Sequence, residues 1–345
     1  MVQGPGALRF VAFCVVFVFA GFAGTRPAGA DDAAVKRGEY LLALAGCAGC
    51  HTDVDGKGPP LAGGRKLKTP FETFYSPNIT PDPEHGIGGW TDADFIRALR
   101  EGIAPGGSHY FPAFPYPTYT KIRDADLRDI KAYIFSLAPV AKSDQPHDID
   151  PPFGWRPLVA GWKLLFFAPG PFKATPGRDE AWNRGAYLVE ALGHCGECHT
   201  PRNALGALKR DEAFSGTLDG PEGGLVPNIT PDADTGIGHW SDGDLKSLFS
   251  MGMLPDGDFV GSGMAEVVEN TTSKLTDADR DAIIVYLRSL PPPQQANRIR
   301  EVTITSEFEN TIRPNRTNSA VANRLFPGRR GAKNSFKCSN LLGWS

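Results

Sequence analysis

The chain has 345 residues, of which 41% are hydrophobic, so it is long enough for two ordinary globular domains. Its formal net charge of −3 at pH 7 gives no indication of nucleic-acid binding, which normally requires a basic surface. The 40 glycines and 30 prolines predict long loops around compact elements.

Residues 1–30 have the features of a secretory signal peptide. Arg9 precedes an apolar run from Phe10 to Ala23, and Ala28-Gly29-Ala30 offers the small residues that a cleavage site requires. The alternative is a transmembrane anchor, but the apolar run is shorter than the ~20 residues that a helix needs to cross a bilayer. We therefore expect cleavage after Ala30 and export from the cytoplasm.

Two short segments share the spacing Cys-x-x-Cys-His, which is the attachment signature of a c-type haem: residues 47–51 and residues 195–199. Thiols three residues apart lie on one face of a helical turn, so both can bond to the vinyl groups on one edge of a haem. The alternative, a pair of zinc knuckles or redox dithiols, would need further Cys or His pairs to complete each site. The sequence therefore predicts two covalently bound haem c groups, attached through Cys47, Cys50, Cys195 and Cys198, with His51 and His199 as proximal iron ligands.

Covalent haem attachment in bacteria takes place outside the cytoplasmic membrane, so the haem motifs agree with the predicted signal peptide. Together they predict a periplasmic protein.

The haem motifs belong to a longer tandem repeat. The second motif follows the first at an offset of 148 residues, and the segment 77–82 recurs as 227–232 at an offset of 150. The segment that ends at Trp90 recurs at the same offset and ends at Trp240. This near-constant offset predicts the same fold built twice, in domains spanning residues 31–140 and 181–293.

Each repeat is expected to hold the same three helices. One helix leads into the haem motif, the next begins at a capping box and ends at a glycine, and the last has a single apolar face and is stopped by proline. The expected ranges are 33–45, Thr91 to near Gly102 and 124–137 in the first repeat, and 181–192, Ser241 to near Gly252 and 277–290 in the second. Since no segment shows sustained strand alternation, we predict an all-α fold of two tandem class I cytochrome c-like domains, each enclosing one covalent haem.

Residues 141–180 form a linker rich in proline and glycine that contains the apolar segment Trp155–Phe167. This segment is too short to span a bilayer. One interpretation is that it packs across both haem domains, and the alternative is a helix that docks on a partner or lies on a membrane surface.

The C-terminal residues 294–345 differ in character from the rest of the chain. Nine Lys or Arg against three Glu give this tail a net charge of +6, and its composition predicts disorder. It is either a docking segment for a membrane or an acidic partner, or an extension without a role. Cys338 is expected to be a free thiol within it.

The sixth ligand of each iron is the main difference between the two repeats. Met264 follows Gly252 by 12 residues and is expected in a loop, where a cytochrome c delivers its methionine to the iron. Met251 and Met253 are the alternatives, but they lie at the end of a helix that should pack on its own core. The same count from Gly102 leads to Phe114, and no methionine lies in residues 31–150. Three possibilities remain for the first haem: ligation by His109, an open or weakly ligated iron, or ligation by His85 or another group.

Two further pairs of repeated residues are candidates for the haem walls. Trp90 and Trp240 each have one N–H donor that could bond to a haem propionate, although packing in the core explains them equally well. Asn78 and Asn228, with their flanking prolines, are expected to shape the loop that covers the haem.

The segment from Trp182 to Asn203, together with the Pro-Asn-Ile-Thr-Pro-Asp and Gly-Ile-Gly-x-Trp segments, resembles the cytochrome c subunits of periplasmic alcohol and gluconate-type dehydrogenases. The resemblance covers about residues 33–293. It implies a subunit that takes electrons from a quinoprotein or flavoprotein dehydrogenase and passes them to quinone or another acceptor. Family members usually carry three haem motifs, whereas this chain has two. They also commonly have the run Pro-Ala-Met-Pro-Tyr in the first domain, whereas residues 112–116 of this chain are Pro-Ala-Phe-Pro-Tyr, with Phe114 in place of the methionine.

These observations predict a periplasmic dihaem electron carrier that works with a dehydrogenase and a downstream acceptor, and not an enzyme in itself. The alternative is a haem enzyme that uses an open first iron on peroxide or on an oxidisable sulfur anion. A third hypothesis is a relay docked on the membrane through the basic tail or the apolar segment of the linker.

Overall fold

The structure is a computed structural model that describes, apart from Met1, residues 28–220 and 224–293. The predicted C-terminal tail with Cys338 and most of the predicted signal peptide lie outside these residues. The predicted cleavage site, residues 28–30, forms the first turn of helix α1.

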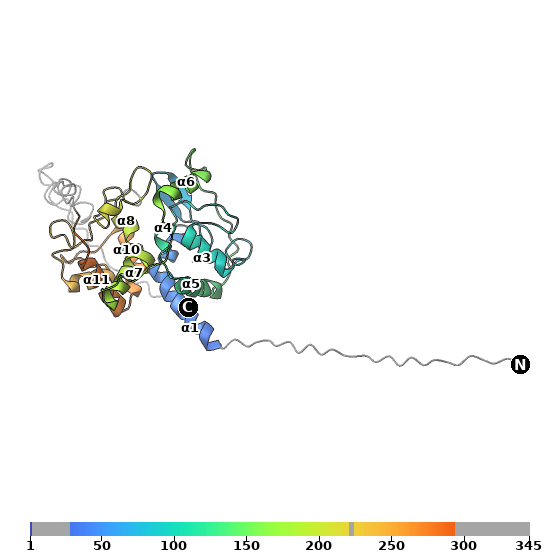
Figure 1. The fold of residues 1–345 in the computed structure, drawn as a ribbon, viewed down its shortest axis with the longest axis horizontal. Coiled ribbons are helices and arrows are strands. Elements are labelled where there is room, and N and C mark those ends of the chain that lie inside the picture. Colours follow the sequence, from blue (N-terminus) through green and yellow to red (C-terminus); the bar gives the residue numbers. More distant parts are fainter. Residues whose placement is uncertain (2–27, 221–223, 294–345) are drawn as a thin grey trace, which may run out of the picture.

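The first half of the chain, with five helices and one hairpin among its described residues, lies on one side of the molecule (Figure 1). Its elements are α1 (Ala28–Leu44), α2 (Cys47–His51), β1 (Lys66–Thr69), β2 (Glu72–Tyr75), α3 (Asp92–Glu101), α4 (Tyr116–Tyr119) and α5 (Asp124–Ser136).

The second half follows the same order of helices on the other side of the molecule (Figure 1). Its elements are α7 (Glu180–Tyr187), the π-helix η1 (Leu188–Leu192), α8 (Gly196–His199), the short 3₁₀ turn η2 (Arg210–Glu212), α9 (Asp242–Met251), α10 (Ser262–Asn270), the 3₁₀ turn η4 (Thr272–Lys274) and α11 (Asp277–Arg288). The linker between the halves contains α6 (Pro157–Phe166).

The predicted capping boxes are present at the starts of α3 and α9. The hydroxyls of Thr91 and Ser241 accept hydrogen bonds from the backbone N–H three residues later, and the acids at those positions bond back to the cap. Both helices end at glycines in the left-handed conformation, Gly102 and Gly252. Local sequence therefore determines where these two helices begin and end.

Two expectations about secondary structure were wrong. An antiparallel hairpin, β1–β2, is present in the first half, where no strand was expected. Its strands have only four residues each, which is too short for the alternation of apolar and polar residues to be recognised. Met264, expected in a loop, lies instead near the start of helix α10.

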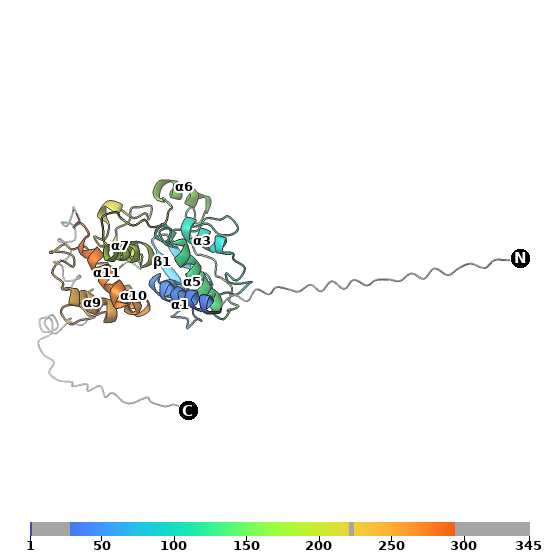
Figure 2. The same cartoon turned by 60° about the horizontal axis from the view of Figure 1, so that its bottom comes forward.

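The core of each half is built on a close crossing of its first and last helices. Figure 2 shows α1 beside α5 and α7 beside α11. A Cβ atom on Gly38 would lie 1.9 Å from the carbonyl oxygen of Asp129, and one on Gly185 would lie 1.9 Å from that of Ala282. The repeated Arg-Gly-x-Tyr-Leu segment therefore contains glycine because the two helix backbones touch at this point.

The two halves contact each other through reciprocal hydrogen bonds. Tyr40 in α1 donates to the carboxylate of Asp279 in α11 over 2.7 Å. Tyr187, the equivalent of Tyr40 in the repeat, donates to the carboxylate of Asp126 in α5. Such an exchange of equivalent contacts is what a two-fold axis produces, so the halves are related by a pseudo-two-fold axis.

Helix α6 contacts both halves. The indole N–H of Trp162 donates to the carbonyl of Leu205 over 2.8 Å. The ammonium of Lys163, which is buried, donates to the carbonyls of Glu101 and Gly102 at the end of α3, over 2.6 and 2.8 Å. The opposite face of the helix is exposed to solvent. The exposed fractions of Leu164 and Leu165 are 89% and 72%.

Within residues 28–220 and 224–293, no helix has the length and apolar character needed to cross a membrane.

Candidate functional site

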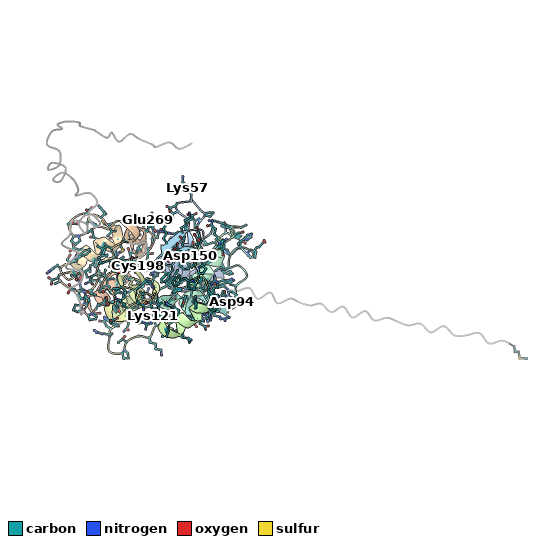
Figure 3. All side chains as sticks on the ribbon, turned by 90° about the horizontal axis from the view of Figure 1, so that it is seen from above. Lys57, Asp94, Lys121, Asp150, Cys198 and Glu269 are labelled. Carbon is teal, nitrogen blue, oxygen red and sulfur yellow. The ribbon has the colours of Figure 1, made fainter. Side chains whose placement is uncertain are left out.

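The two Cys-x-x-Cys-His motifs form the short helices α2 and α8 in equivalent places of the two halves. Their four cysteines, Cys47, Cys50, Cys195 and Cys198, form no disulfide with one another. Burial raises the pKa of the Cys47 and Cys195 thiols to about 12. Figure 3 shows Cys198 near the middle of the molecule.

The histidines of both motifs are oriented by a backbone carbonyl. His51 Nδ1 lies 2.7 Å from the carbonyl oxygen of Pro77, and His199 Nδ1 lies 2.8 Å from that of Pro227. A carbonyl can only accept, so Nδ1 carries the proton and Nε2 is left with a free lone pair. This is the hydrogen bond that fixes a histidine ligand on a metal, and it fits an iron bound at Nε2.

Burial lowers the pKa of both imidazoles, which keeps them neutral and able to coordinate a metal.

The loops that carry Pro77 and Pro227 are held by the two repeated asparagines. The amide of Asn78 donates to the carbonyls of Val140 and Lys142 over 2.7 and 3.0 Å. The side-chain oxygen of Asn78 accepts from the Thr80 backbone N–H, and Asn228 repeats this bond to Thr230. Both asparagines are buried, so their side chains shape the loop whose proline carbonyl holds the motif histidine.

Trp90 and Trp240 are partly buried against the core. The indole N–H groups of Trp162 and Trp182 donate to Leu205 and Ser289, but those of Trp90 and Trp240 make no hydrogen bond within the described residues. Their N–H groups are therefore available to a haem propionate.

Phe114 lies in a cluster of aromatic side chains. Its ring packs against Tyr110, Tyr116 and Tyr119, with centroids 5.5, 6.3 and 5.9 Å away. Met264 occupies the equivalent place in the second half and is partly exposed. The first half thus presents an aromatic ring, which cannot ligate iron, where the second half presents a thioether.

His109 lies on a different side of its segment from Phe114. Burial and the nearby charges of Lys163 and Arg97 lower the pKa of His109, and its Nδ1 is buried without a hydrogen-bond partner. The next residue, Tyr110, packs on Phe114, and consecutive residues of an extended segment point to opposite faces. The structure does not bring His109 together with Phe114, so ligation by His109 remains a prediction.

The contact of His194 with the other half of the molecule was not predicted from the sequence. Its ring packs edge to face on Tyr119 of the first half, with centroids 5.4 Å apart. A comparison of the repeats contained the signal, since a bulky His194 stands where the first repeat has Gly46.

In the part of the chain that the structure describes, no group of three or more His, Cys, Asp or Glu side chains is placed to hold a metal ion. The zinc alternative therefore gains no support there, because a structural zinc site needs four such ligands.

Comparison with known proteins agrees with the site geometry. A family model for cytochrome c matches residues 35–138. A dihaem c-type cytochrome from Cereibacter sphaeroides is 48% identical over 262 residues, which cover 74% of this chain and 86% of the relative.

Two dehydrogenase subunits are similar as well. The cytochrome c subunit of the quinone alcohol dehydrogenase of Gluconobacter oxydans is 39% identical over 274 residues, covering 76% of this chain and 56% of the relative. The gluconate 2-dehydrogenase cytochrome c subunit of Pantoea cypripedii is 42% identical over 270 residues, which cover 76% of this chain and 60% of the relative. The chain thus spans less than two thirds of the length of these two subunits.

The chain belongs to the dihaem c-type cytochromes. Its cofactor is haem c, bound covalently in two copies.

Proposed function

We propose that this chain is a periplasmic electron-transfer protein with two tandem class I cytochrome c domains, residues 31–140 and 181–293. It accepts electrons from a dehydrogenase of the quinoprotein or flavoprotein type and passes them to a downstream acceptor. The observation that carries the proposal is the matched pair of haem motifs, each with its histidine held by a proline carbonyl. The similarity to cytochrome subunits of alcohol and gluconate dehydrogenases supports the choice of donor.

The four motif cysteines hold the two haems, and His51 and His199 coordinate the irons from the proximal side. Bound haem c supplies an iron that gains or loses one electron at a time. Met264 is the sixth ligand in the second half. Since ligation by Met and His raises the reduction potential, electrons enter at the first haem and leave through the second.

A redox titration of the purified protein tests the assignment of Met264. The wild type should show two one-electron waves, and Met264→Ala should lower the potential of the higher one and remove the methionine–iron charge-transfer band. Met251→Ala is the matched control, because Met251 is exposed at the end of α9. A higher wave that stays in place in Met264→Ala would rule out this ligand.

One observation favours a second candidate function. Phe114 and its tyrosine neighbours offer no thioether to the first haem, so its iron could bind peroxide or an oxidisable sulfur anion. Binding of carbon monoxide to one haem of the reduced protein would support this haem enzyme. If both irons are already six-coordinate, carbon monoxide should bind poorly at either haem, and this result would contradict the haem enzyme.

The contact with a membrane is a separate part of the proposal. The candidates are the basic residues 294–345 and the exposed face of α6 around Leu164 and Leu165. Sedimentation with anionic vesicles, with and without residues 294–345, distinguishes a docked protein from a carrier that is free in the periplasm.

A further inference from the structure

The helix that carries Met264 lies between the two halves. Met264 is the third residue of α10, and α10 contacts α2, the short helix that forms the first haem motif. The turn η4, which follows α10, contacts α1, and Figure 2 shows α10 beside α1. The proposed ligand of the second iron therefore sits on a helix that touches the attachment motif of the first haem.

An arginine connects α10 to this motif. Nη1 of Arg65 donates to the carbonyl oxygen of Gly49, between the two cysteines of the first motif, over 2.6 Å. The same nitrogen donates to the carboxylate of Glu266 in α10 over 2.7 Å. Hydrogen bonds between charged partners are stronger than neutral ones. Arg65 thus bridges the backbone of the first haem motif and the helix that carries Met264.

A second contact holds the other end of this helix. Thr271 follows the last residue of α10, and its hydroxyl donates to the carbonyl oxygen of Ala43 in α1 over 3.0 Å. Ala43 lies shortly before Cys47 in the chain. The first half therefore holds α10 both within the helix and directly after its end.

The two faces of α10 are turned toward different halves. Residues two apart on an α-helix point about 200° away from each other, so Met264 faces away from the side on which Glu266 meets Arg65. Val268 shares the face of Met264, because it follows four residues later. It is buried, and its Cγ1 would lie 3.8 Å from a Cβ atom on Gly252 of the second half. The helix thus presents Met264 to its own half while Glu266 anchors it to the other.

The second haem motif makes a comparable contact with the first half. Arg202 donates to the carbonyl oxygen of Glu197 over 3.0 Å, and Glu197 is the equivalent of Gly49 in the repeat. The carboxylate of Glu197 accepts a hydrogen bond from Thr118, four residues after Phe114. Each haem motif therefore has an arginine on the same carbonyl and a polar contact with the segment that follows position 114 or 264 in the other half.

We infer that Arg65 and Glu266 are positioning residues for Met264. Their ion pair holds α10 so that the thioether stays on the second iron, and the first half of the chain thereby controls the ligation of the second haem. This inference rests on the proposed ligation by Met264. The exposed fractions of the two side chains are 21% and 48%, and ion pairs that water reaches are weak, so we expect a graded effect and not a complete loss of the ligand.

Competition with imidazole measures how firmly Met264 is held in the purified, oxidised dihaem protein. Imidazole replaces the thioether on the ferric iron without transfer of an electron, and the methionine–iron charge-transfer band disappears as it binds. The band reports on the second haem alone, because residues 31–150 contain no methionine.

The variants are Glu266→Gln, Arg65→Gln and the double variant, each of which keeps the approximate size of the side chain. Since both residues are partly exposed, the variants should fold and take up two haems. Glu269→Gln is the matched control. Glu269 lies on the same helix, is exposed, and its carboxylate makes no hydrogen bond or ion pair among the described residues.

We expect Glu266→Gln to lower the imidazole concentration at half-displacement about two- to five-fold, which is the range that a partly exposed ion pair can supply. Arg65→Gln should lower it at least as much, because it also removes the bond to Gly49. In the Arg65→Gln background, Glu266→Gln should have no further effect, since the two changes remove the same interaction. Glu269→Gln should leave the concentration unchanged.

An unchanged concentration in Glu266→Gln would overturn the inference, and so would an equal effect of this change with and without Arg65. The same shift in Glu269→Gln would overturn it as well, because a general effect of charge would then explain the result. The failure of the proposed ligand is recognised separately: the wild type would lack the charge-transfer band, or the band would persist in Met264→Ala.

Discussion

At the scale of single residues, the two halves differ at the equivalent positions Phe114 and Met264. Both lie after the glycine that ends the preceding helix, and both lie on the chain segment expected to face the distal side of a haem. The Phe114 ring is already surrounded by three tyrosines, so this pocket is adapted to an aromatic side chain.

Phe114→Met should make the first haem resemble the second. Methionine is flexible enough to fill the space of the ring with a cost below about 1.5 kcal/mol, so the variant should fold. We expect a second methionine–iron charge-transfer band and a higher potential for the lower redox wave. Optical spectra and a redox titration measure both.

Phe111→Met is the control for this change, since Phe111 packs on Phe74 and His147 and not on Phe114. If the lower wave and the spectrum stay the same in Phe114→Met, position 114 does not face the first iron.

Some residues of the site could be predicted from the sequence because their role is encoded locally. The five-residue motifs specify the thiols and the histidine by spacing alone, and the repeat offset connects Phe114 to Met264. His194 could not be predicted in the same way. Its partner Tyr119 comes from the other half, and no local pattern records a contact between residues so far apart in the chain.

At the scale of elements, Lys163 ties the linker helix α6 to the end of α3. Its ammonium bonds to the last carbonyls of α3 and lies over the ring of Tyr116, 4.6 Å from the centroid. These carbonyls carry the negative end of the helix dipole, which favours a cation there. Burial nevertheless lowers the pKa of Lys163 from 10.5 to about 8.

The lowered pKa predicts a dependence of stability on pH. Between pH 8 and 10.5 the unfolded chain binds more protons at Lys163 than the folded chain does, so stability rises with pH in this window. The stabilising contribution is complete above 10.5 and is lost as the pH falls through 8. Lys163→Met lacks this group, so the difference in unfolding free energy between wild type and variant should grow in favour of the wild type as pH rises.

Denaturant titrations of both proteins at several pH values measure this difference. Lys246→Met serves as the comparison, since Lys246 forms an exposed ion pair with Asp281 and should show no such rise. A difference between wild type and Lys163→Met that does not change with pH would contradict the prediction.

The sequence predicted elements well where signals lie within one or two turns of the chain. The hydroxyl and acid of each capping box lie three residues apart, and Asp92–Glu101 and Asp242–Met251 begin directly after them. Helix α6 was harder to interpret. Its apolar residues suggested either internal packing or docking, and the structure gives it a bonded face at Trp162 and Lys163 and an exposed face at Leu164 and Leu165.

At the scale of the whole molecule, the reciprocal bonds of Tyr40 and Tyr187 hold the halves together. The two acceptor carboxylates have different surroundings. Asp279 also accepts two hydrogen bonds from the guanidinium of Arg184, of 2.6 and 2.7 Å. Asp126 has no such bonds to arginine among the hydrogen bonds of the described residues, where Arg37 binds Asp129 instead.

Tyr187→Phe should therefore destabilise the protein more than Tyr40→Phe. Removing a hydroxyl that bonds to a carboxylate costs about 1.5–3 kcal/mol, and the cost is greatest where no other donor replaces it. Unfolding of the haem-loaded protein by denaturant measures both values.

Tyr133→Phe is the matched control, since the Tyr133 hydroxyl makes no hydrogen bond within the described residues. We expect this variant to have the same free energy of unfolding as the wild type. Equal midpoints for Tyr187→Phe and the wild type would show that these bonds do not hold the halves together.

This arrangement of the halves lay beyond the sequence. The repeat predicted two copies of one fold, but Tyr40 and Asp279 are 239 residues apart, and their pairing depends on surfaces that form only after each copy has folded.

The covalent linker between the halves has a consequence for their divergence. Two identical subunits around a true two-fold axis would place His194 against a second histidine, whereas here it lies against Gly46. Because residues 141–180 join the halves, the two copies assemble at the high effective concentration of a tether, whatever the amount of protein. The covalent link thus allows one copy to supply the ring and the other the space for it, and it allows methionine at position 264 where the equivalent position 114 holds phenylalanine.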